Sequence, residues 1–219
     1  MTHAAAHNDY PMRWTSFVRH RMMKCARSVV AGAACFLLFA CSDEDQDKPY
    51  PSIITELCCL HTTSNGTFGH LQLDNGTRYT ISNPQSGYHA SVSYRVLCGF
   101  VPKGGEAEIY QLSAALLLHD STAVQQHDPV SILSSWRSGR FLNFHLAPKT
   151  QGGTQYWGYV VDRIDTSCSE TNAQGEPLTT AYVSLHHNQN ADPTSYTTDV
   201  YASIPLDSIQ ADRIELSPM

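Results

Sequence analysis

The hydrophobic pattern of this chain is that of β-strands over most of its length. From Val92 to Phe100, apolar residues occupy every second position and alternate with Ser93, Arg95, Leu97 and Gly99. A period of two predicts a strand with one buried face and one exposed face. The apolar segment 112–118 shows no decisive period and fits either a short helix or a last strand.

A hairpin is predicted at Asp74-Asn75-Gly76, between the apolar runs Phe68–Leu73 and Thr77–Ile81. The Asn-Gly pair tolerates the positive φ angles of a type I′ turn, which matches the twist of two paired strands.

The second half of the chain contains further strand patterns, separated by turn-forming residues. They lie at 141–147, 155–161, 179–187 and 196–204. Gln151-Gly152-Gly153 separates the first two and 188–193 joins the last two. On the last strand, one face carries Tyr196, Thr198, Val200, Ala202 and Ile204.

The polar residues between Leu118 and Pro129 divide the chain, since no strand pattern crosses them. The first part has about five strands in ~70 residues, which fits a small closed barrel such as an OB-fold. The second part fits an antiparallel sandwich. The predicted fold is all-β: an OB-like domain at 49–118 and a β-sandwich at 128–219.

An export signal precedes these domains. Val29–Ala40 is a 12-residue stretch without charge that follows several basic residues, as in a secretory signal peptide. It is too short to span a hydrocarbon core of about 30 Å. Leu38, Ala40 and Cys41 resemble the bacterial lipobox, so we expect signal peptide 22–40 to be removed and Cys41 to be lipidated. Residues 1–21 show no pattern of their own and are interpreted as upstream of the true start.

An acidic segment, 41–48, follows the lipidated cysteine and is expected to act as a solvated tether. Its residues Ser42, Asp43, Glu44 and Asp45 resemble the surface-export signal of Bacteroidota lipoproteins. The expected location is therefore the outer membrane, with the protein anchored by lipid and exposed at the cell surface.

The charge of the chain argues against nucleic-acid binding. The formal charge is −6; residues 1–40 hold five of the 14 Lys and Arg and one of the 20 Asp and Glu, so the remainder carries −10. An acidic surface repels phosphate backbones. The face of the barrel that could bind nucleic acid has two cations, Arg78 and Arg95. It also has three anions, Asp74, Glu106 and Glu108.

The cysteines show no C-x-x-C spacing, so the sequence indicates neither a zinc site nor a thioredoxin-like motif. Cys58 and Cys59 are neighbours on an expected strand and must face opposite sides, so at most one can reach Cys98. We expect buried free thiols, because Cys behaves as a small hydrophobe.

Several segments together resemble the NigD-like lipoproteins. The specific ones are Ser135-Trp136-Arg137-Ser138-Gly139-Arg140-Phe141-Leu142-Asn143 and Lys149-Thr150-Gln151-Gly152-Gly153; weaker ones are 51–55, 94–98 and 187–193. The resemblance implies an N-terminal OB-like domain and a C-terminal β-sandwich. It also implies an accessory or bacteriocin-immunity-like role, with no activity established for the family.

The chain departs from the family pattern in its last part. It has Asn188 and Ala191 where family members carry Asp and Gly. Family chains also continue with a strand after the segment near Ile214, whereas this sequence stops at Met219, so we expect a truncated C-terminal domain.

Catalytic and metal-binding patterns are missing from the sequence. It has no nucleophile elbow, phosphate-binding Gly loop or H-E-x-x-H motif. His186 and His187 are strand neighbours facing opposite sides, which favours structural or solvent-facing roles over a metal site. We therefore expect no enzyme activity, no cofactor and no metal.

The candidate binding residues are Trp136, Arg137, Arg140 and Trp157. An Arg stacked on an indole can bind a carboxylate or sugar hydroxyls. The alternative, which we favour at this point, makes Trp136 a core anchor and uses the arginines to fix the adjoining turn. Trp157 and Tyr159 share a face that Tyr156 opposes, so one aromatic side is expected in the core.

Two short patterns, at Ser121 and Ser208, resemble acceptor sites of general O-glycosylation in Bacteroidota. The sequence as a whole indicates a non-enzymatic binding or accessory module with an unknown protein partner. The alternative is a surface glycan-binding lipoprotein.

Overall fold

The computed structural model describes residues 51–120 and 127–217. The signal peptide, Cys41, the export residues 42–45 and Ser121 lie outside this part of the chain. The structure is all-β, as the sequence predicts. No helix among the described residues is long and apolar enough to cross a membrane.

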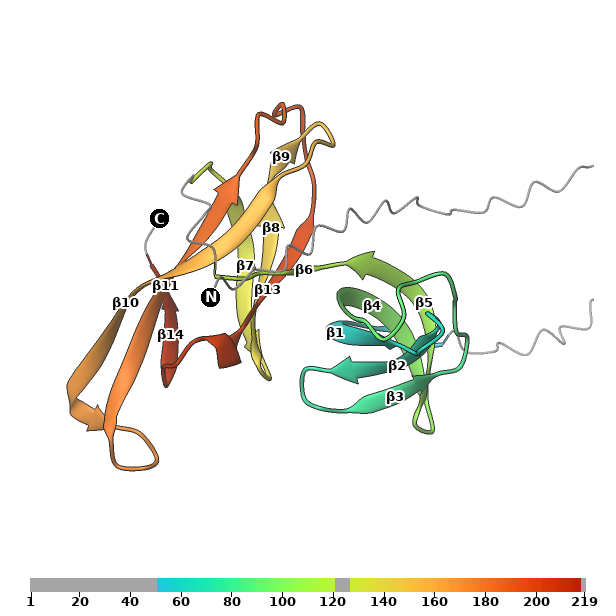
Figure 1. Ribbon diagram of the computed structural model, residues 1–219, viewed down its shortest axis with the longest axis horizontal. Coiled ribbons are helices and arrows are strands. Elements are labelled where there is room, and N and C mark those ends of the chain that lie inside the picture. The colour runs from blue at the N-terminus through green and yellow to red at the C-terminus, as the bar shows by residue number, and fades with distance from the viewer. Residues whose placement is uncertain (1–50, 121–126, 218–219) are drawn as a thin grey trace, which may run out of the picture. The chain divides into compact units, whose positions relative to one another are not determined.

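The N-terminal domain is a closed five-stranded barrel with the strand order β1-β2-β3-β5-β4 (Figure 1). Its strands are β1 (Ile54–Thr62), β2 (Phe68–Leu73), β3 (Arg78–Ile81), β4 (Ser93–Lys103) and β5 (Glu106–Ala114). The parallel pairing of β3 with β5 and the antiparallel pairing of β1 with β4 close the barrel. This arrangement matches the predicted OB-like domain.

The predicted hairpin and the alternating strand of the barrel are both present. β2 and β3 pair in antiparallel register, and Gly76 in the turn has a φ of 88°. On β4, Val96, Cys98 and Phe100 are buried in the barrel core. Arg95 is also buried, although it lies on the opposite face of the strand.

The C-terminal domain is a sandwich whose two main sheets share one core. One sheet has the order β6-β13-β8-β7 and the other β10-β11-β14. The first contains β6 (Leu116–Leu117), β7 (Ser131–Ser138), β8 (Phe141–Ala147) and β13 (Val200–Pro205); the second contains β10 (Tyr156–Thr171), β11 (Pro177–Asn188) and β14 (Arg213–Leu216). Phe144, Leu146 and Ile204 of the first sheet and Tyr159 and Val183 of the second are buried in one cluster.

Two short strands and one turn of 3-10 helix complete this domain. β9 (Lys149–Thr150) pairs with β12 (Tyr196–Thr197), and the 3-10 turn η1 covers Leu206–Ser208.

The ambiguous segment 112–118 forms strands rather than a helix. The boundary between the domains lies before residue 116, earlier than the predicted end of the first domain at residue 118. Its first residues end β5, and Leu116–Leu117 form β6, which pairs with β13 of the sandwich. Leu118 is buried in the sandwich core. Residues 116–118 therefore belong to the second domain, because their backbone and side-chain partners lie there.

One strand assignment of the second half needs correction. Gln151-Gly152-Gly153 separates β8 and the short β9 from β10, as predicted, and β8 and β10 belong to different sheets. The expected strand 196–204 is interrupted between β12 and β13. Tyr196 is consequently 54 % exposed, although Ala202 and Ile204 of β13 are fully buried.

The cysteines follow the expected faces in the barrel. Cys58 is buried, Cys59 is half-buried on the other face, and the described cysteines are free thiols. A hydrogen bond with Cys98 and burial raise the pKa of the Cys58 thiol far above its usual range. Cys168 is exposed at the outer end of β10, so the expectation of burial is wrong for that residue.

Candidate functional site

Trp136 lies on the outer face of the four-stranded sheet, away from the sandwich core. On β8, alternation turns Phe144 and Leu146 toward the core and Asn143 toward the other face. Trp136 pairs directly with Asn143 and so shares this outer face. Its side chain is 37 % exposed. The interpretation of Trp136 as a core anchor is therefore wrong, because that interpretation assigned it to the opposite face of an edge strand.

The outer face of the sheet also carries Tyr201, Ser203 and His145. Tyr201 pairs with His145, and Ser203 with Asn143. The rings of His145 and Tyr201 stack with centroids 4.6 Å apart, and His145 Nε2 lies 2.7 Å from Asp199 Oδ1.

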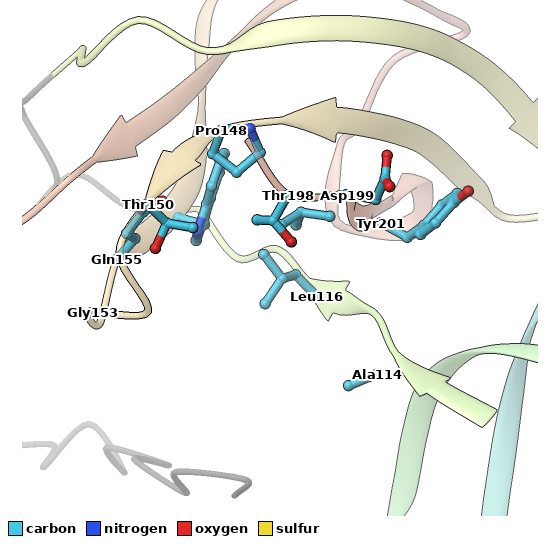
Figure 2. A pocket seen from close by; sticks show the side chains of 11 residues that line it. Ala114, Leu116, Pro148, Thr150, Gly153, Gln155, Thr198, Asp199 and Tyr201 are labelled. Atoms are coloured by element: carbon cyan, nitrogen blue, oxygen red, sulfur yellow. The ribbon is translucent and has the colours of Figure 1, made fainter. Parts of the chain in front are cut away.

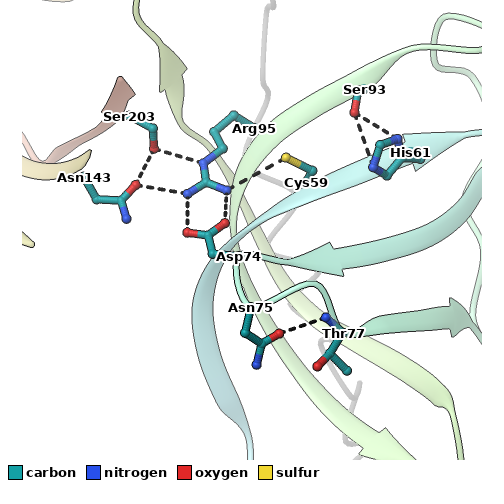
Figure 3. A network of polar contacts seen from close by, with 9 residues as sticks. All are labelled: Cys59, His61, Asp74, Asn75, Thr77, Ser93, Arg95, Asn143 and Ser203. Carbon is teal, nitrogen blue, oxygen red and sulfur yellow. Dashed lines mark hydrogen bonds and ion pairs between the residues drawn. The ribbon is translucent and has the colours of Figure 1, made fainter. Parts of the chain in front are cut away.

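A buried ion pair within the barrel joins Arg95 and Asp74, and Arg95 also bonds to this face of the sandwich (Figure 3). Arg95 donates to the Asp74 carboxylate at 2.5 and 2.8 Å. It also donates to Ser203 Oγ at 2.9 Å, to Asn143 Oδ1 at 3.0 Å and to Cys59 Sγ at 3.9 Å. The guanidinium has five N–H donors, and each of them has an acceptor. Burial disfavours the charged form, but the bonds and charge of Asp74 outweigh it and raise the pKa of Arg95.

Two further contacts fix the same junction. The Arg95 guanidinium lies 3.9 Å from the centre of the Phe141 ring. Gly139, in the turn between β7 and β8, has a φ of 52°, and a Cβ at this position would overlap the backbone carbonyl of Asp74. Only glycine allows the turn to approach the barrel this closely. The segments 94–98 and 135–143, which carry much of the family resemblance, thus meet at one junction.

A cavity of about 620 Å³ lies beside this junction and is called the Trp136 cavity below. Strand pairing places Leu57 and Leu97 side by side on the outer face of β1 and β4. The residues that line the cavity are Thr55, Glu56, Leu57, Asp74, Asn75, Leu97, Trp136, Arg137, Ser138 and Tyr201. The volume is within the range of about 300–1,000 Å³ typical of ligand sites.

Polar groups at the Trp136 cavity remain available to a ligand. Within the described part of the chain, Thr55, Glu56 and Arg137 have no side-chain hydrogen-bond or ion-pair partner. Asn75 uses only its Oδ1, which accepts from the backbone N–H of Thr77 at 2.9 Å. These groups can exchange water for a ligand without breaking a bond inside the protein.

A second cavity, of about 280 Å³, is lined by the other predicted tryptophan, Trp157. Tyr201 lines both cavities. Figure 2 shows Thr150 and Gln155 at one end of this cavity and Tyr201 at the other. Trp157 stacks on His187 with ring centroids 4.0 Å apart. Tyr159 is buried and Tyr156 is exposed, which confirms the predicted division of the aromatic faces.

Gln155 and Thr150, which line this second cavity, are already hydrogen-bonded within the protein. Gln155 Nε2 donates to the Lys149 carbonyl and to Asp192 Oδ2, both at 2.8 Å. Its Oε1 lies 2.9 Å from His187 Nε2. Thr150 Oγ1 donates to Asp192. The Trp136 cavity is therefore the better candidate for ligand binding.

The side chain of Asp192 connects two of the family-like segments through hydrogen bonds. Its carboxylate accepts hydrogen bonds from the backbone N–H groups of Gln151 and Gly153 at 3.1 and 3.0 Å. These bonds and that of Thr150 lower the pKa of Asp192. The Lys-Thr-Gln-Gly-Gly segment and the segment 187–193 thus serve the structure of one turn.

The remaining predicted site residues lie apart from the Trp136 cavity. Arg140 forms an exposed ion pair with Asp207. Ser208 is exposed, but its hydroxyl contacts Tyr159 Oη at 2.6 Å and donates to the Pro205 carbonyl at 2.5 Å. His186 and His187 are both buried. Among the described residues, no group of three His, Cys, Asp or Glu side chains could hold a metal ion.

Sequence reasoning missed Arg95 and Asp74, which it treated as opposing surface charges. The sequence offered no signal for their burial, because a charged residue on the alternate face of a strand is ordinarily exposed to solvent. Tyr201 and Leu57 were missed because nothing local marks them as cavity residues.

The fold and the cavity define a two-domain all-β protein with a barrel, a sandwich and a site at their junction. Residues 115–217 match the NigD-like C-terminal beta sandwich domain. Residues 115–217 therefore form a NigD-like C-terminal domain, as the sequence resemblance implied.

Solved structures from Bacteroides species are similar to this chain in fold. A NigD-like immunity protein from Bacteroides caccae is 25 % identical, with a TM-score of 0.56 over 77 % of this chain and 86 % of that one. A protein of unknown function from Bacteroides vulgatus is 14 % identical, with a TM-score of 0.52 over 74 % and 83 % of the two chains, and shows similarity of fold alone. No curated protein matches the chain.

Proposed function

We propose that this protein is a non-enzymatic accessory protein that binds a protein partner in the manner of an immunity protein. The observation that carries the proposal is the similarity to the Bacteroides caccae NigD-like immunity protein, which extends over both domains of this chain. Exposed Trp, Tyr and Arg side chains dominate the energetics of protein interfaces. Trp136, Tyr201 and Arg137 gather at one cavity, which supports the binding role.

The proposed location is the outer membrane, with the chain anchored through lipid on Cys41 and exposed at the cell surface. The lipobox-like segment before Cys41 and the acidic residues after it support this location. One acyl chain gives only marginal membrane binding, whereas two or more give stable anchoring.

The experiment deletes the gene in its host and measures survival in co-culture with related strains that secrete protein toxins. We expect the deletion to sensitise the host to at least one strain, and the full chain to restore survival. A Cys41→Ser variant, which lacks the anchor, should restore less. Equal survival of deletion and wild-type cells against every strain would contradict the proposal.

Surface glycan binding is the second candidate. It is favoured by the position of Trp136 beside the hydroxyl groups of Thr55 and Ser138 and the amide of Asn75. Binding of the full chain to a glycan array, lost in Trp136→Ala, would support it.

A further inference from the structure

Four of the side chains that line the Trp136 cavity are large and apolar or aromatic. Leu57 and Leu97 form a directly opposed pair on the outer face of β1 and β4, and Leu57 is buried. Trp136 and Tyr201 contribute aromatic rings from β7 and β13. A site made of two leucines and two aromatic rings gains most from an apolar side chain, because burial of apolar area is its main favourable term.

The junction beside the cavity is held by hydrogen bonds within the protein. Asp74, which lines the cavity, is held by two hydrogen bonds from Arg95. Arg95 in turn bonds to Asn143 and Ser203 of the sandwich. A preformed cavity avoids the cost of ordering side chains on binding.

The net charge of the chain favours a partner of the opposite charge. The chain after residue 40 has a formal charge of −10. At the cavity, the negative charge of Asp74 is balanced by Arg95, and Glu56 and Arg137 add one negative and one positive charge, so these four groups carry no net charge. Long-range attraction from the rest of the chain therefore favours a basic partner, whereas contact with the two leucines and two aromatic rings is apolar.

We propose that the Trp136 cavity binds a basic segment of a protein partner by accepting one apolar or aromatic side chain of that segment. The inference rests on the protein-binding role proposed above, but it does not depend on the partner being a toxin.

The test measures binding of short labelled peptides to the full chain in phosphatidylcholine nanodiscs, by fluorescence anisotropy with empty nanodiscs subtracted. The probes are Lys-Lys-Phe-Lys-Lys, Lys-Lys-Ser-Lys-Lys and Glu-Glu-Phe-Glu-Glu. We expect the first peptide to bind about tenfold more tightly than either of the others. Added salt should weaken binding of both lysine peptides, since their attraction is partly long-range.

Two variants and one control locate the site. Trp136→Ala removes a cavity wall and Ser138→Phe fills the cavity, so each should abolish the preference for Phe over Ser. Leu133→Ala is the matched control, because Leu133 is an exposed apolar residue on the same strand but does not line the cavity. It should keep the preference. Melting temperatures of all variants are measured in parallel, and Ser138→Phe decides the outcome if Trp136→Ala unfolds.

An unchanged preference in both cavity variants would overturn the inference, as would equal binding of the acidic and basic Phe peptides. Glycan binding that depends on Trp136, without any preference among the peptides, would identify the cavity as a sugar site and overturn it too. Survival assays in the deletion strain would still report on the accessory role, so the two failures are distinguishable.

Discussion

The substitution Asp74→Ala should destabilise the protein strongly, because it removes the carboxylate and leaves the Arg95 guanidinium buried without its counter-ion. The side chains of Arg95 and Asp74 are 1 % and 4 % exposed. Breaking a buried pair by removing one partner costs about 3–5 kcal/mol, mainly through the uncompensated charge that remains. For a protein of this size, that loss corresponds to a decrease in Tm of about 6–20 °C.

The matched control is Asp165→Ala, which breaks the pair between Arg163 and Asp165. These two side chains are 57 % and 53 % exposed, and exposed pairs contribute only about 0–1 kcal/mol. The assay is urea unfolding followed by circular dichroism, with thermal melting as a second measurement. Equal losses of stability in Asp74→Ala and Asp165→Ala would refute the argument that burial gives the Arg95–Asp74 pair its energetic weight.

Four further predictions concern the anchor and the turns. A palmitate analogue should label wild type but not Cys41→Ser; an unlabelled wild-type chain would contradict lipidation. Replacing residues 43–45 by Ala should keep the chain on the membrane but hide it from external protease, and unchanged digestion would show that they act only as a tether. Ala191 has a φ of 57°, so Ala191→Gly should raise stability in urea unfolding by about 1 kcal/mol. Because hydrogen bonds hold the pKa of Asp192 below its usual 3.8, wild type should lose stability as pH falls through that range toward the lower folded value, and Asp192→Asn should lose less.

The position of Ala191 also gives a physical account of one departure from the family pattern. The sequence resemblance implies Gly at this position, and the structure places the residue in the left-handed region that favours glycine. The sequence showed the departure, but only the backbone conformation explains why Gly is the favoured residue there.

Local rules determined much of the fold. Alternation of apolar residues predicted β4 and its buried residues Val96, Cys98 and Phe100, because side-chain direction in a strand depends only on position. The Asn75-Gly76 pair predicted the hairpin, because turn geometry depends on a few adjacent residues. The family-like segments predicted the pairing of a barrel with a sandwich, which the structure confirms.

The tertiary structure alone decided the site. Trp136 was expected in the core because periodicity gives two faces of a strand without saying which one meets the second sheet. Arg95 was treated as a surface charge, yet it bonds to Ser203, which is 108 positions away along the chain. The sequence by itself therefore determined the strands and the type of each domain, since these depend on neighbouring residues. Burial of Arg95, exposure of Trp136 and the Trp136 cavity depend on contacts between distant strands, and only the folded chain brings those strands together.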